Sequence, residues 1–286
     1  MQTLRVESGG ERLDKFLTER VNCTRSQLKH AKILLNGVPV KSGTILRVGD
    51  VIEFKIQQES LTAEPENITL DVVFEDDHLM VINKPRGMVV HPGAGVKRGT
   101  LLNALLGRGI NLDRAGIIHR LDKNTAGLMV IAKTAEVQAK LSAMFEKREV
   151  KRVYFGLVEG VMNGEGTINK NIARDPNRRT LYRTVMTGGR NAVTHFKVFK
   201  NFSKWTLVQF TLGTGRTHQI RVHSKSIGHP VVGDPEYNQN SSIKNLLGQM
   251  LESVELSFMH PVTAKPVEFS INLSEEFSKT VDKFAL

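Results

Sequence analysis

Hydrophobic positions near the start of the chain follow first a helical and then a strand-like period. Apolar residues recur at three- and four-residue steps over residues 12–21, which predicts an amphipathic helix. A capping-box pair, Thr24 and Gln27, predicts the start of a second helix that would carry Lys32. Short apolar runs then predict strands at 38–40, 44–46 and 51–54. These elements form a small unit that is mostly α with a little β.

The remainder of the chain is longer and richer in strands. Apolar runs at 72–74 and 79–82 flank a polar turn and predict a β-hairpin. The amphipathic stretch 134–149 predicts a helix, and residues 214–223 predict a shorter one. Further strands are predicted at 153–158, 192–199, 205–212, 254–258 and 267–269.

A polar segment without periodicity separates these two parts. Residues 57–67 contain Pro65 and no apolar pattern, which is typical of a linker. We therefore predict a first domain over residues 1–58, a linker over 59–68 and a second domain over 69–286. The mixture of strands and helices predicts an α+β fold.

A polar block interrupts two apolar runs in the second domain. Residues 116–118 and 128–132 predict strands, and the turn between them contains His119, Arg120 and Asp122. A turn needs residues such as Asn and Gly for its backbone geometry, but it does not need these three side chains. Charged side chains on a short loop held by strands are typical of a functional site. The block is therefore predicted to take part in the chemical reaction that the protein carries out.

The composition is that of a globular protein without membrane spans. Hydrophobic residues make up 40% of the 286 residues and charged residues 24%. No apolar run approaches the roughly 20 residues of a membrane-spanning helix, and the N-terminus lacks the apolar core of a signal peptide. We therefore expect a cytoplasmic protein with no membrane association. The single cysteine, Cys23, excludes an intrachain disulfide and a cysteine-rich zinc site.

The net charge of +11 favours a polyanionic partner, nucleic acid first. Residues 140–190 hold 11 Lys and Arg against 5 Asp and Glu, a local excess of 6. Near the N-terminus, Arg25, Lys29 and Lys32 would share one helical face because they are four and three residues apart. Solvent exposure and phosphate contacts are both compatible with such a face.

Several catalytic motifs are missing from the sequence. It contains no His-Glu-x-x-His or other tight metal-ligand motif, and no Gly-x-Ser-x-Gly elbow of a serine hydrolase. Residues 213–215 follow a predicted strand, but His218 stands where a dinucleotide fingerprint has its third glycine. Asp122 remains as a lone carboxylate that nearby cations would hold ionised and in place. Arg120 and Arg221 are the candidates, and a structural salt bridge is the alternative.

Five motifs, in a fixed order and spacing, resemble one family. Residues 119–128 match His-Arg-Leu-Asp-x-x-Thr-Ser-Gly-Leu, and residues 215–223 match Gly-Arg-Thr-His-Gln-Ile-Arg-Val-His. Residues 84–92 match Lys-Pro-x-Gly-x-x-x-His-Pro, residues 151–160 match Lys-x-x-Tyr-x-Gly-x-Val-x-Gly, and residues 233–237 match Gly-Asp-x-x-Tyr. The chain thus resembles the RluA/RluD family of RNA pseudouridine synthases over nearly its whole length.

The first domain resembles an S4 RNA-binding domain, a small α-L-like fold. This resemblance is carried by residues 12–14, 24–26, 36–37 and 49–50. It implies that Arg25, Lys29 and Lys32 contact RNA. For the second domain, the family resemblance implies a catalytic fold with a mixed, mostly antiparallel sheet flanked by helices and loops.

The resemblance also implies roles for single residues. Asp122 aligns with the essential aspartate, which attacks the target nucleoside or abstracts a proton. Tyr154 aligns with a tyrosine that packs against the target base and can act as a base, and Arg221 with the ion-pair partner of the aspartate. Arg120 aligns with an arginine that displaces the target uridine. Further substrate contacts are expected at His119, Thr125 and Leu251. We expect neither a metal nor another cofactor.

Five positions depart from the family pattern and put substrate choice and loop detail in doubt. They are Asn124, Ala126, Asn238, Glu252 and the residue after it, Ser253. The expected function is an RNA pseudouridine synthase that acts on large-subunit ribosomal RNA, as a monomer without an obligate protein partner. A tRNA-directed synthase and a non-catalytic RNA-binding or ribosome-assembly protein are the alternatives.

Overall fold

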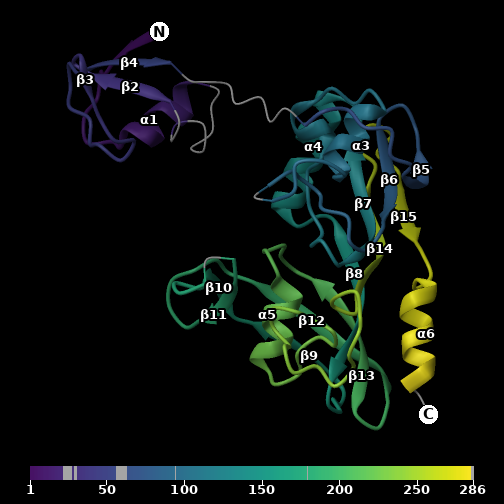
Figure 1. Ribbon diagram of the computed structural model, residues 1–286. Coiled ribbons are helices and arrows are strands. Elements are labelled where there is room, and N and C mark those ends of the chain that lie inside the picture. Colours follow the sequence, from purple (N-terminus) through teal and green to yellow (C-terminus); the bar gives the residue numbers. More distant parts are fainter. Residues whose placement is uncertain (22–27, 29–30, 56–62, 94, 179, 285–286) are drawn as a thin grey trace. The chain divides into compact units, whose positions relative to one another are not determined.

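The chain divides into two compact units, Met1–Thr62 and Ala63–Leu286 (Figure 1). The computed structural model describes residues 1–286 except 22–27, 29–30, 56–62, 94, 179 and 285–286. The division falls inside the segment 59–68 that the sequence indicates as a linker. We refer to the two parts as the N-terminal unit and the C-terminal unit.

The N-terminal unit packs one described helix, α1 (Leu13–Arg20), against an antiparallel sheet. The sheet contains β1 (Gln2–Arg5), β4 (Val51–Lys55), β2 (Lys32–Leu35) and β3 (Val38–Pro39), in that spatial order. The apolar face of α1 is buried, since Leu13, Phe16 and Leu17 share a core with Ile52 and Phe54. The first predicted helix is confirmed.

The prediction that Lys32 lies on a helix is wrong. Lys32 begins strand β2, so it shares no helical face with Arg25 and Lys29, which lie outside the described residues. The physical reason is the turn that follows: Asn36 and Gly37 both adopt positive φ and join β2 to β3 as a hairpin. This tight turn joins strands on both sides, so Lys32 pairs in the sheet, whereas the predicted capping pair, Thr24 and Gln27, lies outside the described residues.

Two other predicted strands are reduced to single bridges. In segment 44–46 only Ile45 pairs, with Arg12, and in segment 116–118 only Ile117 pairs, with Ile131. A 3-10 turn, η1 (Asp113–Gly116), precedes the second of these segments. The polar block after residue 118 therefore begins in an irregular loop and ends at a strand.

A mixed sheet forms the body of the C-terminal unit. Its order over the described residues is β5-β6-β7-β14-β8-β13-β12-β9, with β15 paired to β14. The strands are β5 (Asp71–Glu75), β6 (Leu79–Lys84), β7 (Ala126–Ala132), β8 (Lys151–Glu159), β9 (Glu165–Asn169), β12 (Val193–Asn201), β13 (Trp205–Leu212), β14 (Leu251–Met259) and β15 (Pro266–Ser270). Among the strands that the structure describes, only the β7–β14 pair is parallel, so the predicted mixed, mostly antiparallel sheet is confirmed.

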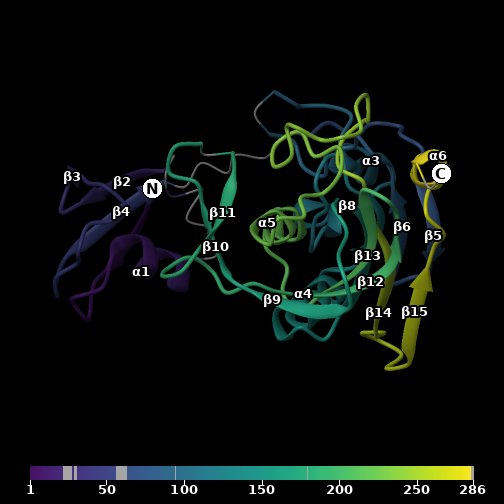
Figure 2. The ribbon, with the colours of Figure 1, turned by 90° about the horizontal axis from the view of Figure 1, so that it is seen from below.

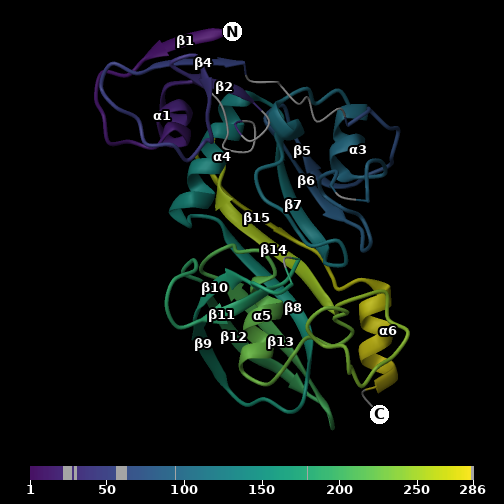
Figure 3. The same cartoon turned by 60° about the vertical axis from the view of Figure 1, so that its left-hand side comes forward.

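Helices and a small hairpin flank this sheet. The helices are α3 (Leu101–Gly107), α4 (Ala135–Lys147), α5 (Gln219–Ser226) and α6 (Glu275–Phe284). The hairpin consists of β10 (Asn171–Arg174) and β11 (Tyr182–Val185). Helix α5 lies between this hairpin and the sheet (Figure 2), and α6 follows β15 at the C-terminal end (Figure 3). Both predicted helices of this unit are present, although α5 begins only at Gln219.

Strand β7 is buried on both faces, which explains its uninterrupted apolar sequence. Met129 and Ile131 belong to the core that includes α3, whereas Leu128 and Val130 belong to the core that includes α4. Successive side chains of a strand point to opposite faces, so a strand covered on both sides needs apolar residues at every position. The run at 128–132 therefore lies at the centre of the unit.

A close approach between β7 and β14 sets the position of the polar block. Gly127 has φ +112°, and a Cβ atom there would lie 2.1 Å from the carbonyl oxygen of Ser253. Only glycine allows the two strands to pair at this point. Ser253 in turn lies opposite Tyr154 of β8. The loop before β7, the start of β14 and the middle of β8 are therefore neighbours.

Candidate active site

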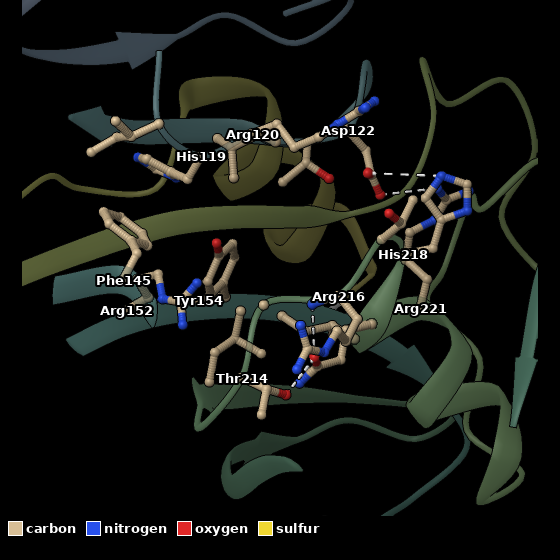
Figure 4. A pocket seen from close by; sticks show the side chains of 18 of the residues that line it. His119, Arg120, Asp122, Phe145, Arg152, Tyr154, Thr214, Arg216, His218 and Arg221 are labelled. Atoms are coloured by element: carbon tan, nitrogen blue, oxygen red, sulfur yellow. Dashed lines mark hydrogen bonds and ion pairs between the residues drawn. The ribbon is translucent and has the colours of Figure 1, made fainter. Parts of the chain in front are cut away.

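A pocket of about 640 Å³ opens in the C-terminal unit where the loop before β7 faces β8, β14 and α5. Seven residues predicted for the site line it, and Figure 4 shows five of them by name. The seven are His119, Arg120, Asp122, Thr125, Tyr154, Arg221 and Leu251. Residues up to 132 positions apart in the sequence thus meet in one cavity.

Asp122 is half-buried and points toward α5 (Figure 4). Its Oδ2 atom accepts a hydrogen bond of 3.0 Å from Nη1 of Arg221. Its backbone carbonyl accepts the N–H of Thr125, which closes the loop into a turn. The sequence left Arg120 and Arg221 as candidate partners, and Arg221 is the one that pairs with the carboxylate.

Arg221 is itself fixed by other acids. Its side chain is 3% exposed, and Asp234 accepts hydrogen bonds from Nε at 2.7 Å and Nη2 at 2.8 Å. Glu236 accepts a further one from Nη2 at 2.6 Å. Burial opposes the charge of Arg221, but Asp234 above all, with Asp122 and Glu236, raises its pKa above the ordinary value. The guanidinium is therefore a permanent cation. Asp234 binds its Nε and Nη2 atoms, and Nη1 is left to bind Asp122.

Tyr154 and Leu251 form an apolar part of the pocket wall. Tyr154 is 6% exposed and Leu251 is 3% exposed. Leu251 pairs with Gly156, whose missing side chain leaves room for its methyl groups. Burial raises the pKa of Tyr154, so its hydroxyl stays protonated near neutrality. This wall is suited to pack against a planar ring.

His119 and Thr125 make their bonds to the protein scaffold. His119 accepts the N–H of Val130 at Nε2, 3.0 Å away, and its ring stacks on Phe145 with centroids 4.6 Å apart. Burial lowers the pKa of His119 to about 3, so the ring is neutral. The hydroxyl of Thr125 accepts a hydrogen bond from Gln249. Both side chains hold the loop, whereas Arg120 is exposed beside the pocket.

Two cations from the 84–92 motif also hold this loop, and the sequence reasoning missed them. Lys84 is fully buried and donates to the carbonyl oxygens of Pro85, Met88 and Lys123 at 2.9, 3.0 and 3.2 Å. Burial lowers the pKa of Lys84 to about 7, and the charge of Asp122 opposes this shift. Arg86 donates to the carbonyl oxygens of Asn124 and Gln249 and pairs with Glu252. Lys84 follows the apolar run 79–82 and precedes Pro85, and a charged residue at the end of such a run is the signal that could have indicated a loop anchor.

His218 is a further residue that the sequence reasoning did not assign to the site. It lines the pocket, and its Nε2 atom lies 3.8 Å from Oδ1 of Asp122. Asp234 and Glu236 were likewise not assigned to the site, although both lie within the matched motif at 233–237. An acidic pair next to a predicted arginine partner is the signal that could have found them.

Arginine side chains make the rest of the pocket basic. The pocket is also lined by Arg148, Arg152, Arg190 and Arg216. Arg152 is largely buried and lies over the ring of Phe145, 5.3 Å from its centroid. A basic, partly aromatic pocket with Asp122 and Glu146 as its two carboxylates matches a nucleotide in an RNA chain, which presents phosphates and a planar base. Among the described residues, no three or more His, Cys, Asp or Glu side chains are grouped to hold a metal ion.

The chain belongs to the RNA pseudouridylate synthase family, whose sequence profile matches residues 78–226. It is 40% identical to an uncharacterised RNA pseudouridine synthase of Bacillus subtilis, over 98% of this chain and 96% of that one. It is 40% identical to ribosomal large subunit pseudouridine synthase D of Haemophilus influenzae, over 95% of this chain and 90% of that one. The protein of the same name from Vibrio cholerae is 41% identical, with 94% and 89% covered.

The fold is also found in solved structures. The human RNA pseudouridylate synthase domain containing 1 protein superposes with a TM-score of 0.60 at 24% identity, covering 72% of this chain and 84% of that one. The family predicted from the motifs is confirmed, and so is the class of enzyme, an isomerase of RNA uridines. None of the described helices is long and apolar enough to cross a membrane.

Proposed function

We propose that this enzyme converts specific uridines of large-subunit ribosomal RNA to pseudouridine, with Asp122 as the reacting carboxylate. The observation that carries the proposal is the environment of Asp122: its carboxylate lies at a basic pocket and is bound by Arg221, a cation that cannot lose its proton. Relatives named as large-subunit synthases, about 40% identical over most of the chain, support ribosomal RNA as the substrate.

The isomerisation makes three demands on the protein. The bond between N1 and C1′ of the uridine must break, the base must turn, and C5 must bond to C1′, while C5 loses a proton and N1 gains one. The base must first be unstacked and held in a pocket, which costs a few kcal/mol. A carboxylate must then add to C1′ or accept a proton from the sugar.

The pocket offers a candidate group for holding the base, for replacing it in the RNA and for reacting with the sugar. Tyr154 and Leu251 would pack against the flipped base, because both belong to the buried wall of the pocket. The exposed Arg120 would occupy the position that the base leaves in the RNA. Arg221 would keep Asp122 ionised and oriented. Because burial raises the pKa of Tyr154, we assign it packing rather than proton abstraction.

The N-terminal unit would supply RNA affinity as an S4 domain. The basic residues assigned to RNA contact are Arg25, Lys29 and Lys32. Of these, Lys32 is described, and its side chain is exposed at the start of β2. We further propose that the enzyme works as a monomer in the cytoplasm.

Pseudouridine formation on purified RNA tests the proposal. The chain and its Asp122→Asn variant are incubated with large-subunit ribosomal RNA and, separately, with bulk tRNA, and pseudouridines are mapped. We expect product in ribosomal RNA with the unchanged chain and none with the variant, while RNA binding survives. Product only in tRNA would support the tRNA-directed alternative. No product in either RNA would support the non-catalytic one.

A further inference from the structure

The backbone at His218 is strained at the point where α5 begins. His218 has φ +56°, in the left-handed region that non-glycine residues avoid, and it stands at the N-cap of the helix. A glycine would adopt this conformation without cost. A backbone outlier at a pocket raises the hypothesis that its side chain has a role there, which its contacts can define.

A short hydrogen-bonded chain orients the imidazole of His218. The backbone N–H of Tyr182, the first residue of β11, donates to the hydroxyl oxygen of Tyr237 at 2.8 Å. That oxygen also lies 2.8 Å from Nδ1 of His218. A hydroxyl oxygen can accept two hydrogen bonds, but we assign the hydrogen of Tyr237 to Nδ1 because no other acceptor for it is found among the described residues. A neutral imidazole then carries its proton on Nε2.

Nε2 is the ring atom that faces the carboxylate of Asp122. It lies 3.8 Å from Oδ1, whereas the other oxygen, Oδ2, is bound by Arg221 at 3.0 Å. The two carboxylate oxygens therefore have different neighbours, one cationic and one neutral. Burial foremost lowers the pKa of His218, which keeps the ring uncharged beside Asp122, Arg221 and Glu236. Contacts of catalytic groups that are long in the free enzyme commonly shorten when substrate binds.

We propose that His218 is a positioning residue for the isomerisation: its neutral Nε2–H directs Oδ1 of Asp122, and Tyr237 holds it in that tautomer. The inference rests on the proposed role of Asp122. A neutral donor orients the carboxylate without cancelling the charge that the reaction uses, which a second cation would do. Orientation matters because a displacement of about 1 Å at a reacting group can cost on the order of 100-fold in rate.

The hydrogen bonds through Tyr237 and His218 also connect the carboxylate of Asp122 to the β10–β11 hairpin. The ring of Tyr182 packs edge-on against His218, with centroids 5.6 Å apart, and its hydroxyl accepts a hydrogen bond from Arg174 of β10. The position of the hairpin thereby sets the position of Tyr237 and the tautomer of His218. Loss of the Tyr237 hydroxyl should therefore reduce the rate through His218.

Three substitutions of His218 separate positioning from backbone structure. Gln places an amide N–H near the position of Nε2, whereas Asn tolerates positive φ better but its amide reaches only the position of Nδ1. Gly removes the side chain and relieves the backbone. We expect His218→Gly and His218→Asn to lower the single-turnover rate about 10- to 100-fold, and His218→Gln to restore most of it. KM and RNA affinity should change little.

The controls make each outcome decisive. Asp122→Asn is measured in parallel, and circular dichroism checks that every variant is folded. Tyr237→Phe is made alone and with His218→Gln, and its loss of rate should be smaller in the Gln background, where no tautomer needs fixing. Rate restored by Asn as well as by Gln would assign His218 a backbone role and overturn the inference.

A full rate in His218→Gly, with Asp122→Asn inactive, would also overturn the inference and leave the proposed function intact. An active Asp122→Asn would instead refute the proposed role of Asp122.

Discussion

Replacing Gly127 by Ala should damage both the stability of the C-terminal unit and its catalytic rate. Gly127 stands at the start of β7, five residues after Asp122, and its φ of +112° is one that L side chains rarely adopt. The new Cβ would meet backbone atoms of Ser253, which cannot rotate away as a side chain could. The parallel pairing of β7 with β14 must therefore open.

The size of the effect follows from this geometry. The contact must lengthen from 2.1 Å to the 3.4 Å of an ordinary van der Waals contact, so the strands separate by about 1.3 Å. The unfavourable φ costs about 1–2 kcal/mol, and overpacking costs about 1–3 kcal/mol more. For a unit of this size, a total of about 2–5 kcal/mol lowers Tm by roughly 4–20 °C. Because Ser253 lies opposite Tyr154, the same movement should lower the rate about 100-fold.

Gly164→Ala is the matched control for this change. Gly164 has φ +68°, but nothing lies within 4 Å of its Cβ position, so the substitution adds backbone strain without a clash. Thermal unfolding and single-turnover pseudouridine formation are measured for both variants. If Gly127→Ala were no less stable than Gly164→Ala and kept its rate, the close approach of β7 and β14 would not be what positions the site.

Four further predictions concern the loop, its partner and the RNA. Because His119 has a folded pKa of about 3 against an ordinary 6.5, the unfolded chain binds the extra proton, and stability is lost as pH falls from 6.5 toward 3. Urea unfolding at pH 7 and pH 5 should show a loss of about 1–2 kcal/mol that His119→Gln lacks. Arg221→Lys should lower the rate about 100-fold with RNA affinity unchanged, because an ammonium cannot hold Asp234 with two bonds and also reach Asp122; equal rates would contradict this. Deleting residues 1–58 should weaken RNA binding and flatten its salt dependence, and an unchanged salt slope would exclude phosphate contacts there. Incubation with EDTA should leave the rate intact, and a loss restored by one metal would refute the metal-free chemistry.

Local pattern was enough to predict most elements and to single out Asp122 as the candidate reacting group. The period-two and uninterrupted apolar runs predicted β6, β7, β8 and β13, because strand side chains alternate between faces that are either buried or exposed. Asp122 stood out because a turn has no structural need for a carboxylate beside His and Arg. The resemblance to the family rested on motifs that are themselves local.

Local pattern failed where neighbours distant in the sequence decide the conformation. Lys32 follows a good capping box, yet it forms a strand because pairing with β4 and the turn at Asn36 and Gly37 are more favourable. Residues 116–118 are apolar, but only Ile117 finds a partner strand. In both segments the outcome depends on whether a partner strand is available, and the spacing of apolar residues does not record this.

The sequence therefore predicts that Asp122 reacts, and the tertiary structure decides what surrounds it. Arg120 is two residues away and exposed, while Arg221, 99 residues away, makes the ion pair because α5 lies against the loop before β7. Asp234 and His218 reach the same point through the order of strands and the start of α5. Helix and strand formation depend on near neighbours, but the charges that control a carboxylate depend on which elements the sheet places side by side.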